Sequence, residues 1–115
     1  MDRVIEDVLR YRAAADELIA GLQRQTASSD DDITMMRSGI TMADKMRRSN
    51  SSELSRGLTA QLAAFEAVRR DVRVSITAAL VDEGITTAEI GELFGVTRQL
   101  ANRFVQEAQR SRDIT

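Results

Sequence analysis

The stretch TTAEIGELFGVTRQLANRFVQ, residues 86–106, decides the fold of the C-terminal part of this chain. Thr86 and Glu89 have the T-x-x-E spacing of a capping box, in which the threonine hydroxyl oxygen accepts a hydrogen bond from a free backbone N–H and the glutamate reaches back to the threonine N–H. We therefore expect a helix to begin at Thr87. It should end at Phe94, because Gly95 can adopt the left-handed backbone that closes a helix without a steric penalty.

A second helix is expected directly after this turn. Val96 is predicted to be buried, and the side chain of Thr97 can cap the helix that follows. The inward face of that helix has the i, i+3, i+4 spacing at Ala101, Phe104 and Val105. Two helices joined by a short turn that contains a glycine form a helix-turn-helix.

The same residues resemble a known family. The segment GVTRQLANRF, residues 95–104, resembles the GVSRQA-type start of the recognition helix in small bacterial and phage transcriptional regulators and in sigma-factor-like DNA-binding domains. The resemblance covers only residues 66–115. It implies a DNA-binding gene regulator whose buried positions are apolar or small, here Ile90, Gly91, Phe94, Val96, Ala101 and Phe104. This chain departs from the family at Gly91, where alanine is usual, and at Ala101, where valine or isoleucine is usual.

The outward face of the second helix carries the side chains expected to contact DNA. Glutamine and asparagine can form two hydrogen bonds with adenine, and arginine can form two with guanine. The residues predicted to read bases are Arg98, Gln99, Asn102 and Gln106. Phosphate contacts suit arginines, hydroxyls and the free N–H groups of a helix N-terminus. The residues predicted to bind phosphate are Thr87, Thr97, Arg103, Arg110 and Arg112. The alternatives are a plain helical hairpin and a helix-turn-helix that binds protein, since fold does not fix function.

The distribution of charge along the chain supports the predicted DNA contacts more than the net charge does. The chain carries a net charge of −2, whereas DNA-binding domains are often strongly basic. Residues 97–112 contain four arginines and one acidic residue, Glu107, while residues 1–32 contain eight acidic residues and four arginines. The positive charge is therefore concentrated on the helix predicted to meet DNA.

Composition predicts an all-α chain with little core of its own. The 115 residues include three Phe, one Tyr and no Trp, so a single copy would bury little apolar surface and is expected to share a subunit interface. No strand pattern is present, and the absence of His, of Cys and of a glycine-rich phosphate loop argues against an enzyme, a cofactor or a metal site. No signal peptide or long apolar run is found, which predicts a soluble cytoplasmic protein without membrane contact. Lys45 is the only lysine beside fifteen arginines, a hint of a bacterial or phage source.

A first helix is predicted from about residue 2 to about residue 24. One apolar row on it steps by three and four residues, which is the heptad spacing of a coiled coil. The residues predicted to form a dimer interface are Val4, Val8, Tyr11, Ala15, Leu18 and Leu22. A second row, Ile5, Leu9 and Ile19, widens the apolar stripe. The alternative is an amphipathic helix that packs only within its own domain.

The middle of the chain is predicted to contain a loop and two more helices. Residues 26–32 are polar and suggest a short loop, in which Asp30, Asp31 and Asp32 would stabilise the N-terminus of a methionine-rich helix at 33–48 instead of binding a metal. Gly39 could bend that helix. Residues 49–52 mark the best boundary, and Ser51 or Ser52 can cap a long helix with no stop signal before Gly84, although a break near residues 66–71 remains open.

These patterns predict a helical oligomerisation region at 1–65, joined by the long helix to a helix-turn-helix domain at 66–115. The predicted function is a sequence-specific transcriptional regulator, repressor-like, that binds double-stranded DNA as a homodimer on a palindromic or repeated operator. Two alternatives stay open: a phage or plasmid DNA-packaging or partition adaptor, and a protein-binding helical module that antagonises another regulator through its N-terminal half.

Overall fold

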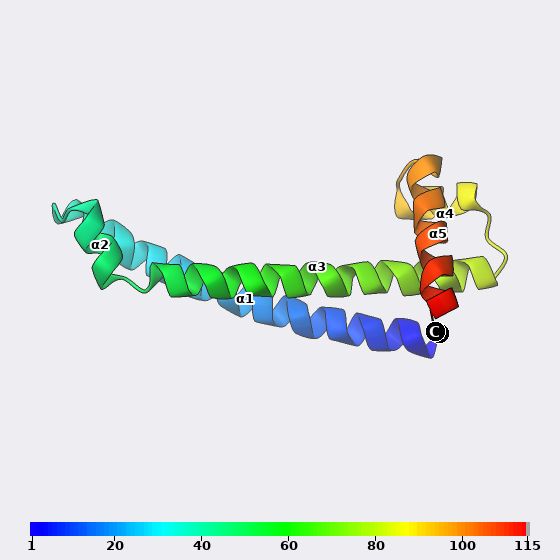
Figure 1. Cartoon of the computed structure of the whole chain (residues 1–115), viewed down its shortest axis with the longest axis horizontal. Helices are drawn as coiled ribbons and strands as arrows, with labels where there is room; N and C mark the ends of the chain where they lie inside the picture. Colours follow the sequence, from blue (N-terminus) through cyan, green and yellow to red (C-terminus); the bar gives the residue numbers. More distant parts are fainter. Residues whose placement is uncertain (115) are drawn as a thin grey trace. The chain divides into compact units, whose positions relative to one another are not determined.

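The computed structural model describes the backbone of residues 1–114 and the side chains of residues 1–112. This part of the chain folds into the helices α1 (Asp2–Arg37), α2 (Met42–Arg48), α3 (Ser51–Asp82), α4 (Thr87–Phe94) and α5 (Arg98–Ile114), shown in Figure 1. It contains no strand. The prediction of an all-α fold is confirmed. No helix in the described part is long and apolar enough to cross a membrane.

The chain divides into two compact units, and α1 and α3 contribute to both. Residues 12–66 form one unit, which we call the hairpin unit. Residues 1–11 and 67–115 form the other, which we call the C-terminal unit. The first eleven residues thus group with the C-terminal part, whereas the sequence-based division placed them in the region 1–65. The oligomerisation and DNA-binding roles of the predicted regions stay predictions.

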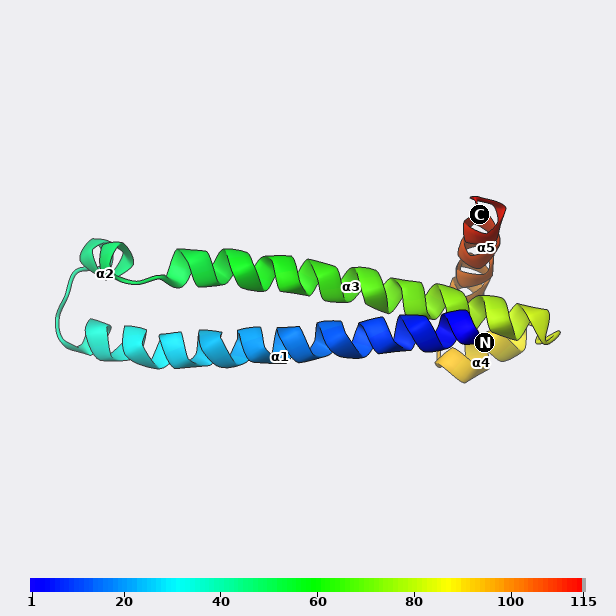
Figure 2. The same ribbon diagram turned by 90° about the horizontal axis from the view of Figure 1, so that it is seen from below.

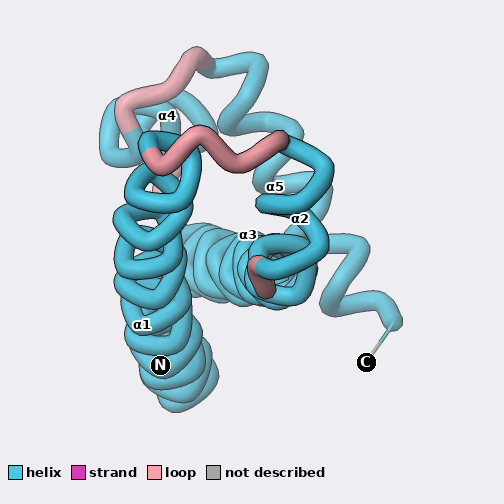
Figure 3. The backbone as a smooth tube through the Cα atoms, turned by 90° about the vertical axis from the view of Figure 1, so that its left-hand side faces the viewer, coloured by secondary structure: helices cyan, strands magenta, loops and turns pink. Residues whose placement is uncertain are grey.

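In the hairpin unit, the α1 and α3 segments lie side by side and antiparallel (Figures 1 and 2). They are connected by α2 and by short loops, drawn in pink in Figure 3. The less exposed positions recur every three or four residues on both segments: Ala14, Leu18, Gly21, Gln25, Ser28 and Asp32 on α1, and Leu54, Leu58, Gln61 and Phe65 on α3. Gly21 faces Gln61 of α3, and a Cβ at this position would collide with Oε1 of Gln61 unless that side chain moved. The heptad spacing is therefore used inside the chain, as in an antiparallel coiled coil.

The loop predicted at residues 26–32 was wrong, because α1 continues through it to Arg37. The hydroxyls of Thr26, Ser29 and Thr34 each donate to the carbonyl oxygen four residues earlier, at 3.0, 2.9 and 3.1 Å. A hydroxyl satisfied in this way does not compete with the helix for backbone groups. These polar residues are therefore compatible with a continuous helix.

The single helix predicted at 33–48 was also wrong. Residues 38–41 interrupt it, with Gly39 in the left-handed region at φ 88°. Thr41 then caps α2, its hydroxyl oxygen accepting from the backbone N of Asp44 at 3.2 Å. Gly39 ends a helix here, where the sequence suggested only a bend.

The aspartates at 30–32 do not cap a helix, since all three lie inside α1. Asp32 instead forms an ion pair with Lys45 of α2, at 3.1 Å between Oδ2 and Nζ. Both side chains are nearly buried, with 15% and 10% of their surface exposed. The carboxylate of Asp32 therefore neutralises the only lysine of the chain. Among the described residues no acidic cluster has the geometry to hold a metal ion.

The long helix predicted after residue 50 is confirmed as α3, which begins at Ser51 and has no break at residues 66–71. It ends at a turn formed by Gly84, whose φ is 83°. The backbone N–H of Gly84 bonds to the carbonyl of Val81 and that of Ile85 to the carbonyl of Leu80, both at 3.0 Å. This pair of bonds is a Schellman motif, which satisfies the last carbonyl groups of the helix.

The core of the C-terminal unit lies where α4 and α5 pack on the last turns of α3. Its fully buried side chains are Ile90 and Ala101, with 0% of their surface exposed, while Ala108 is 4% exposed. Thr77 is also fully buried, and its hydroxyl donates to the carbonyl of Arg73 at 2.7 Å. The rings of Phe94 and Phe104 meet edge to face with their centroids 5.8 Å apart. Small side chains thus bring these helices close together.

Candidate nucleic-acid interface

The turn between α4 and α5 has the geometry that the sequence predicted. Thr86 caps α4, its hydroxyl oxygen accepting from the backbone N of Glu89 at 3.2 Å. Gly95 follows the last residue of α4 with φ 69° and ψ 33°, in the left-handed region. The backbone N–H of Val96 bonds to the carbonyl of Gly91 at 2.9 Å. Thr97 then accepts from the backbone N of Leu100 at 3.1 Å, so both predicted helix starts and the turn are confirmed.

The inward face of α4 and α5 is also as expected. Ile90, Gly91 and Ala101 are buried, and Phe94, Val96, Phe104 and Val105 are half-buried. A Cβ on Gly91 would lie 3.1 Å from the carbonyl oxygen of Val96 and 3.5 Å from the Cβ of Ala101. Glycine at 91 and alanine at 101 therefore allow α4 to lie close to the turn and to α5.

The predicted base-contacting side chains lie together on the exposed face of α5. Arg98, Gln99, Asn102 and Gln106 are all exposed, as is Arg103. Thr87, at the start of α4, joins three of them around a hollow of about 340 Å³ lined by Thr87, Arg98, Gln99 and Asn102. The structure thus brings the N-terminus of α4 and the first turns of α5 to one concave surface, which we call the α4–α5 hollow.

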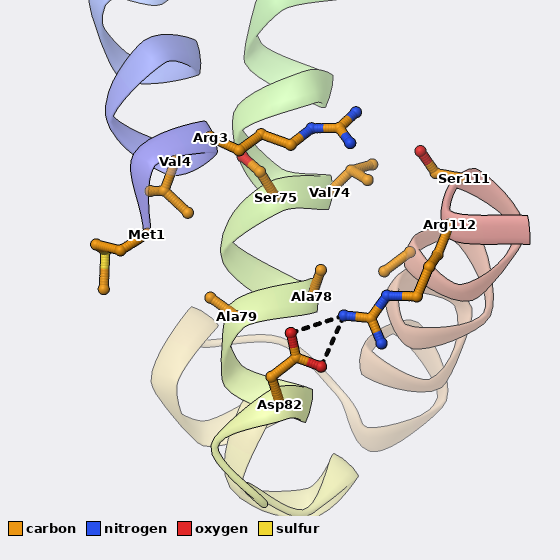
Figure 4. Close-up of a pocket in the computed structure, with 11 residues that line it drawn as sticks. Met1, Arg3, Val4, Val74, Ser75, Ala78, Ala79, Asp82, Ser111 and Arg112 are labelled. Carbon is orange, nitrogen blue, oxygen red and sulfur yellow. Dashed lines mark hydrogen bonds and ion pairs between the residues drawn. The ribbon is translucent and has the colours of Figure 1, made fainter. Parts of the chain in front are cut away.

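Two of the predicted phosphate ligands lie elsewhere. Nη2 of Arg112 lies 2.6 and 2.7 Å from the two carboxylate oxygens of Asp82 on α3 (Figure 4). Arg112 borders a cavity of about 180 Å³ formed by the ends of α1, α3 and α5, and Arg110 borders a separate charged hollow with Arg3 and Arg70. The structure therefore does not bring Arg110 and Arg112 to the α4–α5 hollow.

The arginines that neutralise Glu107 were missed by the sequence analysis. Arg73 on α3 donates to Oε1 of Glu107 at 2.8 Å, and Arg70 lies 3.3 Å from Oε2. The guanidinium of Arg73 also lies 4.5 Å from the centroid of the Phe104 ring, as a cation–π contact. Burial raises the pKa of Glu107, but the hydrogen bond and charge of Arg73, together with Arg70, outweigh it and lower the pKa below its ordinary value.

This arrangement changes the charge of α5. Glu107 is the only acidic residue between positions 97 and 112, and its charge is compensated by arginines of α3. Arg98 and Arg103 therefore act on their surroundings without an opposing carboxylate from that stretch. The i, i+3 spacing of Arg70 and Arg73 could be seen in the sequence, but nothing there indicated which helix they would face.

The six residues predicted to form a dimer interface divide into two groups. Val4, Tyr11, Ala15 and Leu18 are half-buried within the chain, whereas Val8 and Leu22 are exposed. Val4 borders the cavity of Figure 4 beside Val74 and Ser75. Packing inside the chain accounts for much of this heptad spacing without a second subunit. The role of these residues in dimerisation stays a prediction.

Comparison of the chain with protein-family models, with curated proteins and with solved structures finds no match.

Proposed function

We propose that this chain is a sequence-specific DNA-binding transcriptional regulator that acts as a repressor-like dimer. The proposal rests on one observation: Arg98, Gln99 and Asn102 are exposed side by side on the first turns of a helix that begins directly after a left-handed glycine turn. A helix that reads the major groove uses its N-terminal turns to contact base edges. Arginine, glutamine and asparagine are the side chains that form two hydrogen bonds to guanine or adenine there.

The surroundings of these three residues suit a phosphate backbone. Thr87 is the first residue of α4 and borders the α4–α5 hollow, so free N–H groups of a helix N-terminus lie beside the base-reading side chains. Arg103 is exposed on the same helix, and Glu107 is neutralised by Arg70 and Arg73. We therefore expect an affinity for DNA that falls steeply as salt rises.

The operator is expected to be palindromic or repeated, because two identical protomers carry two identical reading helices. Half-sites roughly 34–36 Å apart, or a multiple of this, would place both reading helices on one face of the DNA.

The direct test measures DNA binding by fluorescence anisotropy, with sites selected from random duplexes and with the region upstream of the coding sequence. Arg98→Ala, Gln99→Ala and Asn102→Ala should each remove about 1–3 kcal/mol of discrimination between the selected site and a scrambled one. Arg56→Ala is the matched control, because Arg56 is exposed on α3 in the hairpin unit. Selective binding that survives the triple substitution would exclude α5 as the reading helix.

A protein-binding helical module is the second candidate. It is favoured by the exposed methionines Met36, Met42 and Met46, with 43%, 59% and 49% of their surface exposed, because methionine makes adaptable binding surfaces. Absence of binding to any duplex at low salt, together with a stable complex with a purified regulator, would replace the first proposal with this one.

A further inference from the structure

The hairpin unit leaves one row of mainly apolar side chains largely exposed on α1, with only Ala15 and Ser29 half-buried. The row steps by four and three residues through Ala15, Ile19, Leu22, Thr26, Ser29, Ile33 and Met36. Each of its residues from Ala15 to Ile33 comes directly after a residue of the row that packs on α3. Ile19, Leu22, Ile33 and Met36 keep 53%, 46%, 41% and 43% of their surface exposed. We call this set of seven residues the outer row.

The two polar members of the outer row do not need water for their hydroxyls. Thr26 donates to the carbonyl of Leu22 and Ser29 to that of Gln25, at 3.0 and 2.9 Å. Their hydroxyls can therefore lose contact with water without losing a hydrogen bond. A shallow hollow of about 440 Å³, lined by Ile19, Leu22, Gln23, Thr26, Ala27 and Asp30, lies along this face.

Leu62 of α3 extends the same face and is 45% exposed. Gly21 and Gln61 oppose each other across the hairpin. Because the two helices are antiparallel, the residue after Gly21 and the residue after Gln61 lie on the same side of the hairpin. Leu22 and Leu62 therefore border one apolar surface.

We propose that the outer row is the surface on which a second copy of this chain docks, with the two α1 helices antiparallel. This names the dimer surface on which the proposed function rests. Exposed apolar rows with heptad spacing are buried when two such helices pack together. The small residues Thr26, Ala27 and Ser29 let the two helices approach at the centre, while Ile19 and Leu22 of one copy pack against Ile33 and Met36 of the other.

Charge favours the antiparallel orientation. Asp16, Gln23, Asp30 and Arg37 follow the outer edge of the row at intervals of seven residues. A two-fold axis between residues 26 and 27 brings Asp16 of each copy opposite Arg37 of the other, and Gln23 opposite Asp30. Within the described residues neither Asp16 nor Arg37 has an ion-pair partner. In a parallel pair in register, Asp16 of one copy and Arg37 of the other would lie 21 residues, about 32 Å, apart along the axis and could not pair.

The test measures self-association of the full chain without DNA, by sedimentation velocity over a range of concentrations. Leu22→Glu should raise the dimer dissociation constant by at least about 100-fold, because it places a charge in an apolar contact. Its helical content should not change, since Leu22 is exposed. The control is Leu93→Glu, at an apolar residue of α4 that is 66% exposed. This substitution should leave association unchanged.

Two further experiments test the orientation. Asp16→Arg and Arg37→Asp should each weaken the dimer, and the double variant should restore it. The chain contains no cysteine, so a single introduced cysteine can form a disulfide only with the same residue of another copy. Thr26→Cys should form a disulfide between copies, whereas Ile33→Cys should not, because antiparallel packing separates the two copies of residue 33 by about 20 Å along the axis.

A chain that stays monomeric at all concentrations would overturn the proposal, as would a dimer that tolerates Leu22→Glu. Efficient cross-linking through Ile33→Cys would overturn the antiparallel arrangement. Because DNA is absent from these measurements, their result is separate from that of the DNA-binding test.

Discussion

Replacing Gly95 with alanine tests the turn on which the α4–α5 hollow depends. Gly95 has φ 69°, and a Cβ added there would meet no other group within 4 Å. The substitution therefore introduces no collision with other parts of the protein. Its effect is confined to the backbone conformation of one residue.

The expected magnitude follows from this geometry. A side chain with a Cβ in the left-handed region costs roughly 1–2 kcal/mol. Alanine also restricts the unfolded chain, which stabilises the folded state by about 0.4–1 kcal/mol. We therefore expect Gly95→Ala to lower the free energy of unfolding by about 1 kcal/mol. Gly95→Asn should cost less, since asparagine tolerates this region better.

Gly57→Ala is the matched control. Gly57 lies inside α3 and is exposed, and a Cβ there also meets nothing within 4 Å. Because glycine inside a helix is unfavourable, this substitution should stabilise the protein by about 0.5–1 kcal/mol. The same chemical change is thus expected to have opposite signs at the two positions.

Urea unfolding followed by far-ultraviolet circular dichroism measures both variants, and hydrogen exchange in α4 and α5 localises the effect of Gly95→Ala. A Gly95→Ala protein as stable as the original, or stabilised like Gly57→Ala, would refute the left-handed turn. It would also remove the basis for placing Arg98, Gln99 and Asn102 on one protruding helix.

Three further predictions concern stability. Ile90→Ala should lower the free energy of unfolding by about 2–5 kcal/mol, because it empties part of a fully buried site; urea unfolding measures this, and a loss below 1 kcal/mol would argue against the packing of α4 on α5. The pKa of Glu107 is lowered in the folded protein, so its stabilising contribution is present above the ordinary value of 4.5 and is lost as the pH falls through the lower folded value. The loss of stability that Glu107 causes in acid should therefore be missing in Glu107→Gln. Equal profiles of unfolding free energy against pH for the two proteins would contradict the pairing with Arg73. Asp32→Ala should cost about 3 kcal/mol because it leaves the nearly buried charge of Lys45 without its partner; Asp32→Leu combined with Lys45→Met should recover most of this loss in a double-mutant cycle.

The C-terminal helices could be predicted because their ends are encoded locally. Thr86, Thr97 and Gly95 act on backbone groups within a few residues of themselves. The same holds for Gly84 at the end of α3. A signal that depends only on neighbouring residues can be found in one sequence. The exposed face of α5 followed from these boundaries, since they set which residues face inward.

The N-terminal half was predicted less well because its polar residues are satisfied by partners that composition does not reveal. Thr26 and Ser29 indicated a loop, yet their hydroxyls bond to the preceding turn of α1. Asp32 indicated a helix start, yet its partner is Lys45, thirteen residues later and on another helix. Tertiary pairing thus overrides a local tendency here. The same limit applies to Glu107, whose arginine partners are on α3.

The heptad spacing of α1 shows why a partner helix cannot be identified from a pattern alone. Two rows on this helix have the same spacing and differ by one residue. The row that packs on α3, which we call the inner row, contains Gly21, Gln25, Ser28 and Asp32 beside Ala14 and Leu18, whereas the outer row contains Ile19, Leu22, Ile33 and Met36. Apolar content alone would therefore assign the outer row to α3, but the structure places the inner row there. The small residues Gly21 and Ser28 of the inner row leave room for α3, and the larger apolar residues Ile19, Leu22 and Ile33 stay exposed.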